Sequence, residues 1–366
     1  MANGVVGIKP TVGVTSRNGV IPISETQDSV GPYGRTVADT ARALDVIAAE
    51  DLEDKFTLQP GRQQPKSYCD FLTDRHALKG ARFGLPIKRF WDVAPPPQRK
   101  VAESVLKLIE DAGGLIIHVE MPCAEERLAP DGEWDWEKYG DTHPEISEIT
   151  VSKVQTYYLM NRYLSKLKNT NMNTLEDIIK YNDDNRGTEG GHASDLPAWP
   201  DGQKLFRECV ETKGIKTETY YAALRHIQSQ CRHNGIDAAL RDPSLTTANS
   251  KEDGQQLDAL LFCDVKAGGI QIAAQAGYPV LSIPIGLDSD GMPVPLTLQH
   301  TAWREDQLVK WGSAIEDLLL EQKQHGLGRC PPRYREHLCK RIPLDHEYRY
   351  PKGLYLHTKG NSEKEA

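Results

Sequence analysis

Hydrophobic positions along the chain alternate between short strand-like runs and longer helix-like stripes. Apolar runs predict buried strands at 81–85, 115–119, 257–262 and 279–283. Apolar residues three or four positions apart predict helices over about 36–49, 218–233 and 305–322, the last with Leu308, Trp311, Ile315 and Leu318 inward. A further helix follows Pro95–Pro97, with Val101, Val105, Leu108 and Ala112 on one face and Gly113–Gly114 at its end.

The strand at 81–85, this helix and the strand at 115–119 together form a β-α-β pattern. Such a unit joins two parallel strands through a crossover helix, which predicts the α/β fold class. The first 34 residues are dense in glycine, proline, serine and threonine and predict short strands with tight turns. Thr36 with Asp39, and Thr174 with Asp177, have the spacing of a helix-capping pair.

Residues 146–167 form a long helical stripe, whereas residues 183–202 are polar, rich in glycine and proline, and predict a loop. The chain shows no internal repeat. We therefore expect one interleaved α/β body over residues 1–322, followed by a polar basic tail over 323–366. That tail has ten basic and five acidic residues, although the whole chain carries a net charge of −8.

Composition and charge exclude several classes of protein. With 39% hydrophobic residues the 366-residue chain can bury a sizeable core, and it has no apolar run of the length that spans a bilayer. A net negative charge without a recognised module argues against a nucleic-acid partner. We expect neither nucleic-acid nor membrane partners.

The seven cysteines are scattered and include no C-x-x-C pair, so they predict neither a disulfide framework nor a zinc site. The first residues show no basic or apolar region of a signal peptide. These features predict a reducing, cytoplasmic location. No H-E-x-x-H and no phosphate-binding loop occurs, so we expect no metal and no cofactor.

No complete catalytic set can be read from the residues alone. The G-x-S-x-G motif of many serine hydrolases is absent. Ser24 and Ser282 have no base beside them in the sequence, and a hydroxyl in such a place more often bonds to nearby backbone.

Two blocks of the sequence nevertheless resemble the amidase signature family. The first holds Asn3–Gly13, Gly19–Ser24, Gln27–Asp28, Gly31–Pro32 and Arg35–Asp39, and the second holds Ala273–Val280, Pro284–Gly286 and Gly291–Pro293. Residues 173–177 and 235–240 are similar to the larger, fungal-type members. The resemblance covers about residues 1–320 and implies a mixed β-sheet covered by helices and the hydrolysis of carbon–nitrogen bonds in amides.

The resemblance also implies where the catalytic residues lie. The family uses a Ser–Ser–Lys triad, in which a lysine activates a serine nucleophile through a second serine. The first block follows directly after the nucleophile loop, and Lys9 matches a structural lysine of the family rather than the base. We therefore expect the N-terminal part of the fold, and every catalytic residue, to be missing from this chain. Alone, it should fold poorly and be inactive.

By the same resemblance, Val20 and Ile21 line the acyl pocket, and Gln27 and Asp28 hold the strand beside the nucleophile loop. We expect these four residues to form the wall of the substrate pocket. A role for Asp28 in the scaffold alone is equally consistent with the sequence. A small-molecule amide is the expected substrate once the N-terminal part is present, and a homodimer is allowed. Two other functions stay open: a non-catalytic remnant that acts by binding, and a partner-dependent amidotransferase-type subunit.

Overall fold

The computed structural model describes residues 3–124, 142–195, 201–241, 256–263, 269–322 and 326–330. Most of the expected basic tail, from residue 331 onward, lies outside these residues, and so the proposed division at residue 322 stays a prediction. The described chain falls into two compact units. The first contains residues 3–20, 24–124, 142–151 and the described residues from 217 onward, and the second contains residues 21–23, 152–195 and 201–216.

The described strands are β1 Val6–Lys9, β2 Tyr33–Gly34, β3 Arg82–Pro86, β4 Leu115–Val119, β5 Ala259–Phe262, β6 Val280–Leu287 and β7 Pro293–Gln299. The helices are α1 Val37–Ile47, α2 Pro96–Asp111, α5 Glu148–Leu164, α6 Leu175–Asp184, α7 Arg186–Glu189, α8 Lys204–Glu211, α9 Glu218–Cys231, α10 Asp237–Ala239, α11 Gly269–Ala276 and α12 Glu305–Leu320. Short 3-10 or π turns cover Lys55–Leu58, Tyr68–Phe71, Arg75–Leu78, Ile87–Trp91, Pro144–Ile146 and Arg232–Ile236.

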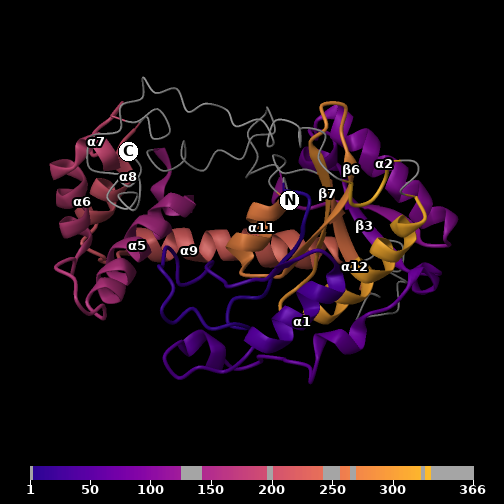
Figure 1. Cartoon of the computed structure of the whole chain (residues 1–366), viewed down its shortest axis with the longest axis horizontal. Coiled ribbons are helices and arrows are strands. Elements are labelled where there is room, and N and C mark those ends of the chain that lie inside the picture. Colours follow the sequence, from indigo (N-terminus) through magenta and orange to yellow (C-terminus); the bar gives the residue numbers. More distant parts are fainter. Residues whose placement is uncertain are drawn as a thin grey trace, which may run out of the picture. The chain divides into compact units, whose positions relative to one another are not determined.

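A seven-stranded mixed sheet forms the centre of the first unit, in the order β2-β1-β6-β7-β5-β3-β4. β3 pairs in parallel with β4 and with β5, and the remaining pairs are antiparallel. The expected β-α-β unit and the α/β class are thus confirmed. In Figure 1 the strands lie between α2 on one side and α11 on the other.

The core of this unit consists of apolar side chains on the central strands and the helices that cover them. β5 and β7 are buried along their whole length, as a strand covered on both faces must be. On one face Phe83 meets Trp311 of α12 edge to face, with ring centroids 5.5 Å apart. Gly312 of α12 lies directly against Leu281 of β6, where a larger side chain would collide.

Helices build the second unit. Its core comprises Met160, Leu164, Leu175, Ile179 and Cys209, contributed by α5, α6 and α8. The Thr174–Asp177 pair forms a complete capping box, as its spacing predicts. The expected loop at 183–202 is only partly correct, because α6 continues to Asp184 and α7 follows it. Short-range polar bonds, such as that of Asn185 Nδ2 to Tyr181 O, support a helical turn there.

Candidate functional site

The two sequence blocks that carry the family resemblance lie side by side in the first unit. β1 pairs antiparallel with β6, with Gly7 opposite Ser282 and Lys9 opposite Val280. Just beyond β1, the amide of Val12 donates to the carbonyl of Gly277, at 3.0 Å. Segments about 270 residues apart in the chain therefore share one stretch of backbone hydrogen bonding.

Two groups of opposite charge, the half-buried Lys9 and the buried Glu305, lie at this junction. The Lys9 amine donates to the carbonyls of Pro10 (3.0 Å) and Tyr278 (2.9 Å). Burial lowers the pKa of Lys9 to about 8, and the nearby Glu305 carboxylate opposes that shift. The Lys9 bonds go to backbone carbonyls, which fits the structural role that the resemblance implies for this lysine.

Glu305, the first residue of α12, joins the helix to the same junction. Its Oε1 accepts the backbone amide of Thr11 at 2.6 Å, while its Oε2 is buried with no hydrogen-bond partner among the described residues. Burial raises the pKa of Glu305, and the bonds from Thr11 and the charge of Lys9 oppose the shift. The carboxyl thus ties α12 to the chain just after β1.

The loop that contains the expected pocket residues is anchored by Arg17. Its guanidinium donates two hydrogen bonds of 2.8 Å to the Asp54 carboxylate and a third, of 2.7 Å, to the carbonyl of Glu25. Burial of Asp54 opposes its ionisation, but the bonds and charge of Arg17 outweigh this and hold the pKa of the carboxyl below its usual range. Arg17 also lies over the Phe56 ring, 4.6 Å from its centroid.

Within this loop, Asp28 closes a short turn with Ser24. Asp28 Oδ2 accepts the amide of Ser24 at 2.8 Å, and the amide of Asp28 donates to the Ser24 carbonyl at 3.1 Å. The Ser24 hydroxyl lies 3.2 Å from that of Thr26. The structure therefore brings Asp28 and its half-buried neighbour Gln27 into the anchored loop.

The two apolar residues expected in the pocket wall are exposed. Val20 is 43% exposed and lies in the first unit, and Ile21 is 64% exposed and belongs to the second. Close to Ile21, the carbonyl of Ile23 accepts the Thr156 hydroxyl at 3.1 Å. The role of all four residues as a pocket wall stays a prediction.

A second polar cluster, which the sequence did not indicate, lies next to the junction. The Tyr278 hydroxyl donates to Asp237 Oδ2 at 2.9 Å, and Arg232 Nε donates to the Ala276 carbonyl at 2.8 Å. Gln275, buried in α11, bonds to Glu148 through its amide and accepts the Cys231 thiol. The available signal was the pair of glutamines, Gln271 and Gln275, within an otherwise small and apolar helix.

Two pockets, of about 430 and 350 Å³, lie elsewhere in the first unit. The larger follows α2 and β4, and the smaller is lined by residues of α1, β6 and α12. None of the four expected wall residues lines either one. Within the described ranges, no group of three or more histidine, cysteine, aspartate or glutamate side chains is placed to hold a metal ion.

The fold and the junction define an α/β protein in which two distant motif blocks form one buried polar centre. A family model described as Amidase matches residues 1–137. A Schizosaccharomyces pombe protein named as an amidase is 40% identical over 346 residues, or 94% of this chain and 57% of the relative. The peptide amidase of Stenotrophomonas maltophilia superposes with a TM-score of 0.70 at 30% identity, over 91% of this chain and 60% of that one.

More distantly, a glutamyl-tRNA(Gln) amidotransferase component of Lactiplantibacillus plantarum is 27% identical over 343 residues, 88% of this chain and 61% of the relative. The chain belongs to the amidase signature family, as its two motif blocks indicate. It spans about 60% of the length of these relatives.

Proposed function

We propose that this chain forms the scaffold and part of the substrate-pocket wall of a hydrolase that cleaves carbon–nitrogen bonds in small linear amides. The observation that carries the proposal is the β1–β6 junction, where both family blocks meet around Lys9 and Glu305. The similarity to a peptide amidase of known structure supports the same class of reaction.

In this proposal the nucleophilic serine and its lysine base come from a segment outside these 366 residues. Lys9 donates to two carbonyls, which suits a structural lysine rather than a base. The Ser24 hydroxyl bonds within its own turn. The Ser282 hydroxyl is buried without a hydrogen-bond partner in the part of the chain that the structure describes, so no base is bonded to it there. By themselves the 366 residues are then inactive.

The exposed side chains of Val20 and Ile21 support their part in this proposal. A substrate or a further segment of chain that covers them would remove apolar surface from water. Asp28 acts indirectly, because its carboxylate holds the turn at Ser24 through a backbone bond. Gln27 lies beside it in the same anchored loop.

Amide hydrolysis by the purified chain tests the proposal. We expect no release of ammonia from a C-terminally amidated dipeptide above the rate without protein. Turnover that is lost in Ser24→Ala but kept in the neighbouring Ser29→Ala would contradict it, because the chain would then hold its own nucleophile.

The similarity to amidotransferase components supports a second candidate, a subunit that works with a partner chain. This candidate predicts that the native protein elutes in a complex with a second polypeptide. A third, non-catalytic binding, predicts amide binding without hydrolysis even when the missing nucleophile segment is supplied.

We also propose a cytoplasmic location. All six cysteines in the described ranges are free thiols, which suits a reducing compartment. Among the described helices, none has the length and apolarity needed to cross a bilayer.

A further inference from the structure

β4 lies at one end of the sheet, with β3 on its inner side. In the described part of the chain no strand pairs with its outer edge. The strand reads Leu-Ile-Ile-His-Val; Leu115 is 51% exposed, and Ile116 and Ile117 are half-buried. Proteins usually cover, charge or pair an apolar edge strand, because its open backbone otherwise recruits another chain.

The backbone of β4 presents a regular set of groups at this edge. The amide of Leu115 donates inward, to the carbonyl of Ala81, at 2.7 Å. Because successive residues of a strand direct their backbone groups to opposite sides, Ile117 also bonds toward β3. The amides and carbonyls of Ile116 and His118 therefore face outward.

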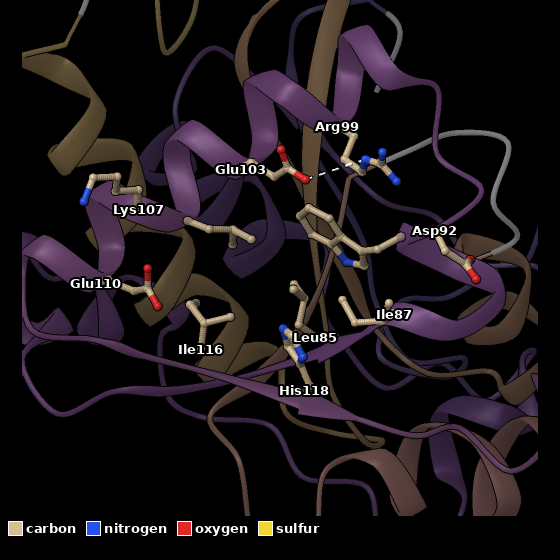
Figure 2. A pocket seen from close by; sticks show the side chains of 11 residues that line it. Leu85, Ile87, Asp92, Arg99, Glu103, Lys107, Glu110, Ile116 and His118 are labelled. Atoms are coloured by element: carbon tan, nitrogen blue, oxygen red, sulfur yellow. Dashed lines mark ion pairs between the residues drawn. The ribbon is translucent and has the colours of Figure 1, made fainter.

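Beside the edge runs the pocket of about 430 Å³, between α2 and β4 (Figure 2). Its floor includes Leu85, Leu106 and Ile116, and one wall is the outer side of α2. Along that wall the charges alternate in sign, from Arg99 through Glu103 and Lys107 to Glu110. The only ion pair drawn between these lining residues joins Arg99 and Glu103, at 3.6 Å.

We propose that a second copy of this chain pairs with β4 in antiparallel register, about a two-fold axis perpendicular to the sheet at Ile117. Opposite residues of an antiparallel pair point to the same face, so such an axis must pass through a residue and not between two. Ile117 is the centre that pairs all five residues of β4. Each Ile116 then exchanges two backbone bonds with His118 of the other copy.

The charge pattern on α2 favours a second copy over any other occupant. A two-fold axis lays the wall of one copy against the same wall reversed. Arg99 then faces Glu110 of the second copy, and Glu103 faces its Lys107. A wall that alternates positive, negative, positive, negative is complementary to itself in reverse, as an interface between identical surfaces requires. The apolar floor is covered at the same time.

Disulfide trapping tests the register. In this pairing the two Ile117 residues form a pair without backbone bonds, with Cα atoms about 4.5 Å apart, which suits a disulfide. The two Leu115 residues lie about 13 Å apart, at ~3.3 Å per residue, beyond the reach of a disulfide. Under mild oxidation of the purified protein we expect Ile117→Cys to give a covalent dimer, and Leu115→Cys and the unchanged chain to give none.

Charge reversal tests the α2 contact in a way that does not depend on trapping. Lys107 is 75% exposed, so Lys107→Glu should fold normally. It places like charges opposite each other twice in the dimer, and we expect about a tenfold weaker dimer in sedimentation equilibrium. The double variant Glu103→Lys with Lys107→Glu restores opposite charges and should recover dimerisation.

The proposal would be overturned by a monomeric wild-type protein at micromolar concentration. It would equally be overturned if Ile117→Cys melts like wild type yet yields no covalent dimer. Equal trapping of Leu115→Cys and Ile117→Cys would also contradict it, because random collision would then explain both. Neither test requires amide hydrolysis, so the interface is judged independently of the proposed function.

Discussion

His300, a buried histidine near the β1–β6 junction, should make the free energy of unfolding depend on pH. This side chain is 2% exposed, and its Nδ1 accepts the amide of Thr301 at 2.9 Å. Burial, aided by the charge of Arg304, lowers the pKa of His300 to about 4.

The unfolded chain takes up a proton at this histidine near pH 6.5, whereas the folded chain does so only near pH 4. The contribution of the neutral His300 to the free energy of unfolding is therefore fully present above pH 6.5. It decreases by about 3 kcal/mol as the pH falls toward 4. We expect His300→Asn to lose less stability than wild type between pH 7 and pH 4 in urea unfolding. Identical pH profiles for the two proteins would contradict the buried neutral histidine.

Lys9 and Glu305 should behave as a coupled pair. Lys9→Met leaves two carbonyls without a donor and the buried carboxyl without its opposite charge. We expect a loss of about 2 kcal/mol in the free energy of unfolding, because two carbonyls lose the hydrogen bonds of a charged donor.

A double-mutant cycle measures that coupling. Adding Glu305→Gln to Lys9→Met removes the uncompensated charge but keeps an acceptor for Thr11, so the double variant should be more stable than Lys9→Met alone. Lys204→Met, at an exposed lysine of α8, is the matched control and should change stability by less than about 0.5 kcal/mol. Additive effects of the two changes would show that the residues do not interact.

The coupling between Lys9 and Glu305 could not be predicted from the sequence, because the two residues are far apart in the chain. The resemblance identified Lys9 as structural, but only the fold shows which carbonyls it meets. Similarly, the resemblance predicts a place for Gln27 and Asp28 beside the nucleophile loop but does not show that Arg17 anchors their turn.

At the scale of elements, the loop from Ser16 to Asp28 depends on one guanidinium. Arg17 and Asp54 are 13% and 8% exposed at their side chains, and the contact is bidentate. A lysine cannot reproduce that planar geometry. We expect Arg17→Lys to lower the free energy of unfolding by about 2 kcal/mol. Arg42→Lys, at an exposed contact of 3.4 Å, should have almost no effect; equal effects in chemical denaturation would contradict the anchoring role.

Local rules predicted most elements well, since capping and periodicity act over a few residues. Thr36 caps α1 by accepting the amide of Asp39, and β4 has the expected bounds. The buried face of α2 was predicted less accurately. Ala102, Val105, Leu106 and Ile109 are buried, whereas the sequence pattern indicated Val101, Val105, Leu108 and Ala112. The elements that pack against a helix decide which of its faces is buried, and the sequence of the helix alone does not show where those elements lie.

At the scale of the whole molecule, the order of strands required more than local patterns. The parallel pair β3–β4 follows from its crossover helix, but the β1–β6 pairing joins distant segments, and neither the local patterns nor the family resemblance predicted it. The edge position of β4 could not be predicted from the sequence either, because an apolar run does not show whether a strand is central or at an edge.

We propose that these residues form the scaffold of an amide hydrolase and carry no activated serine of their own. The intact mass of the purified chain after exposure to a fluorophosphonate, which reacts with activated serines, tests this directly. We expect an unchanged mass for the chain and an unchanged mass for Ser24→Ala. A single adduct on the wild-type chain, mapped to Ser24, Ser282 or any other serine and absent after heat denaturation, would contradict it.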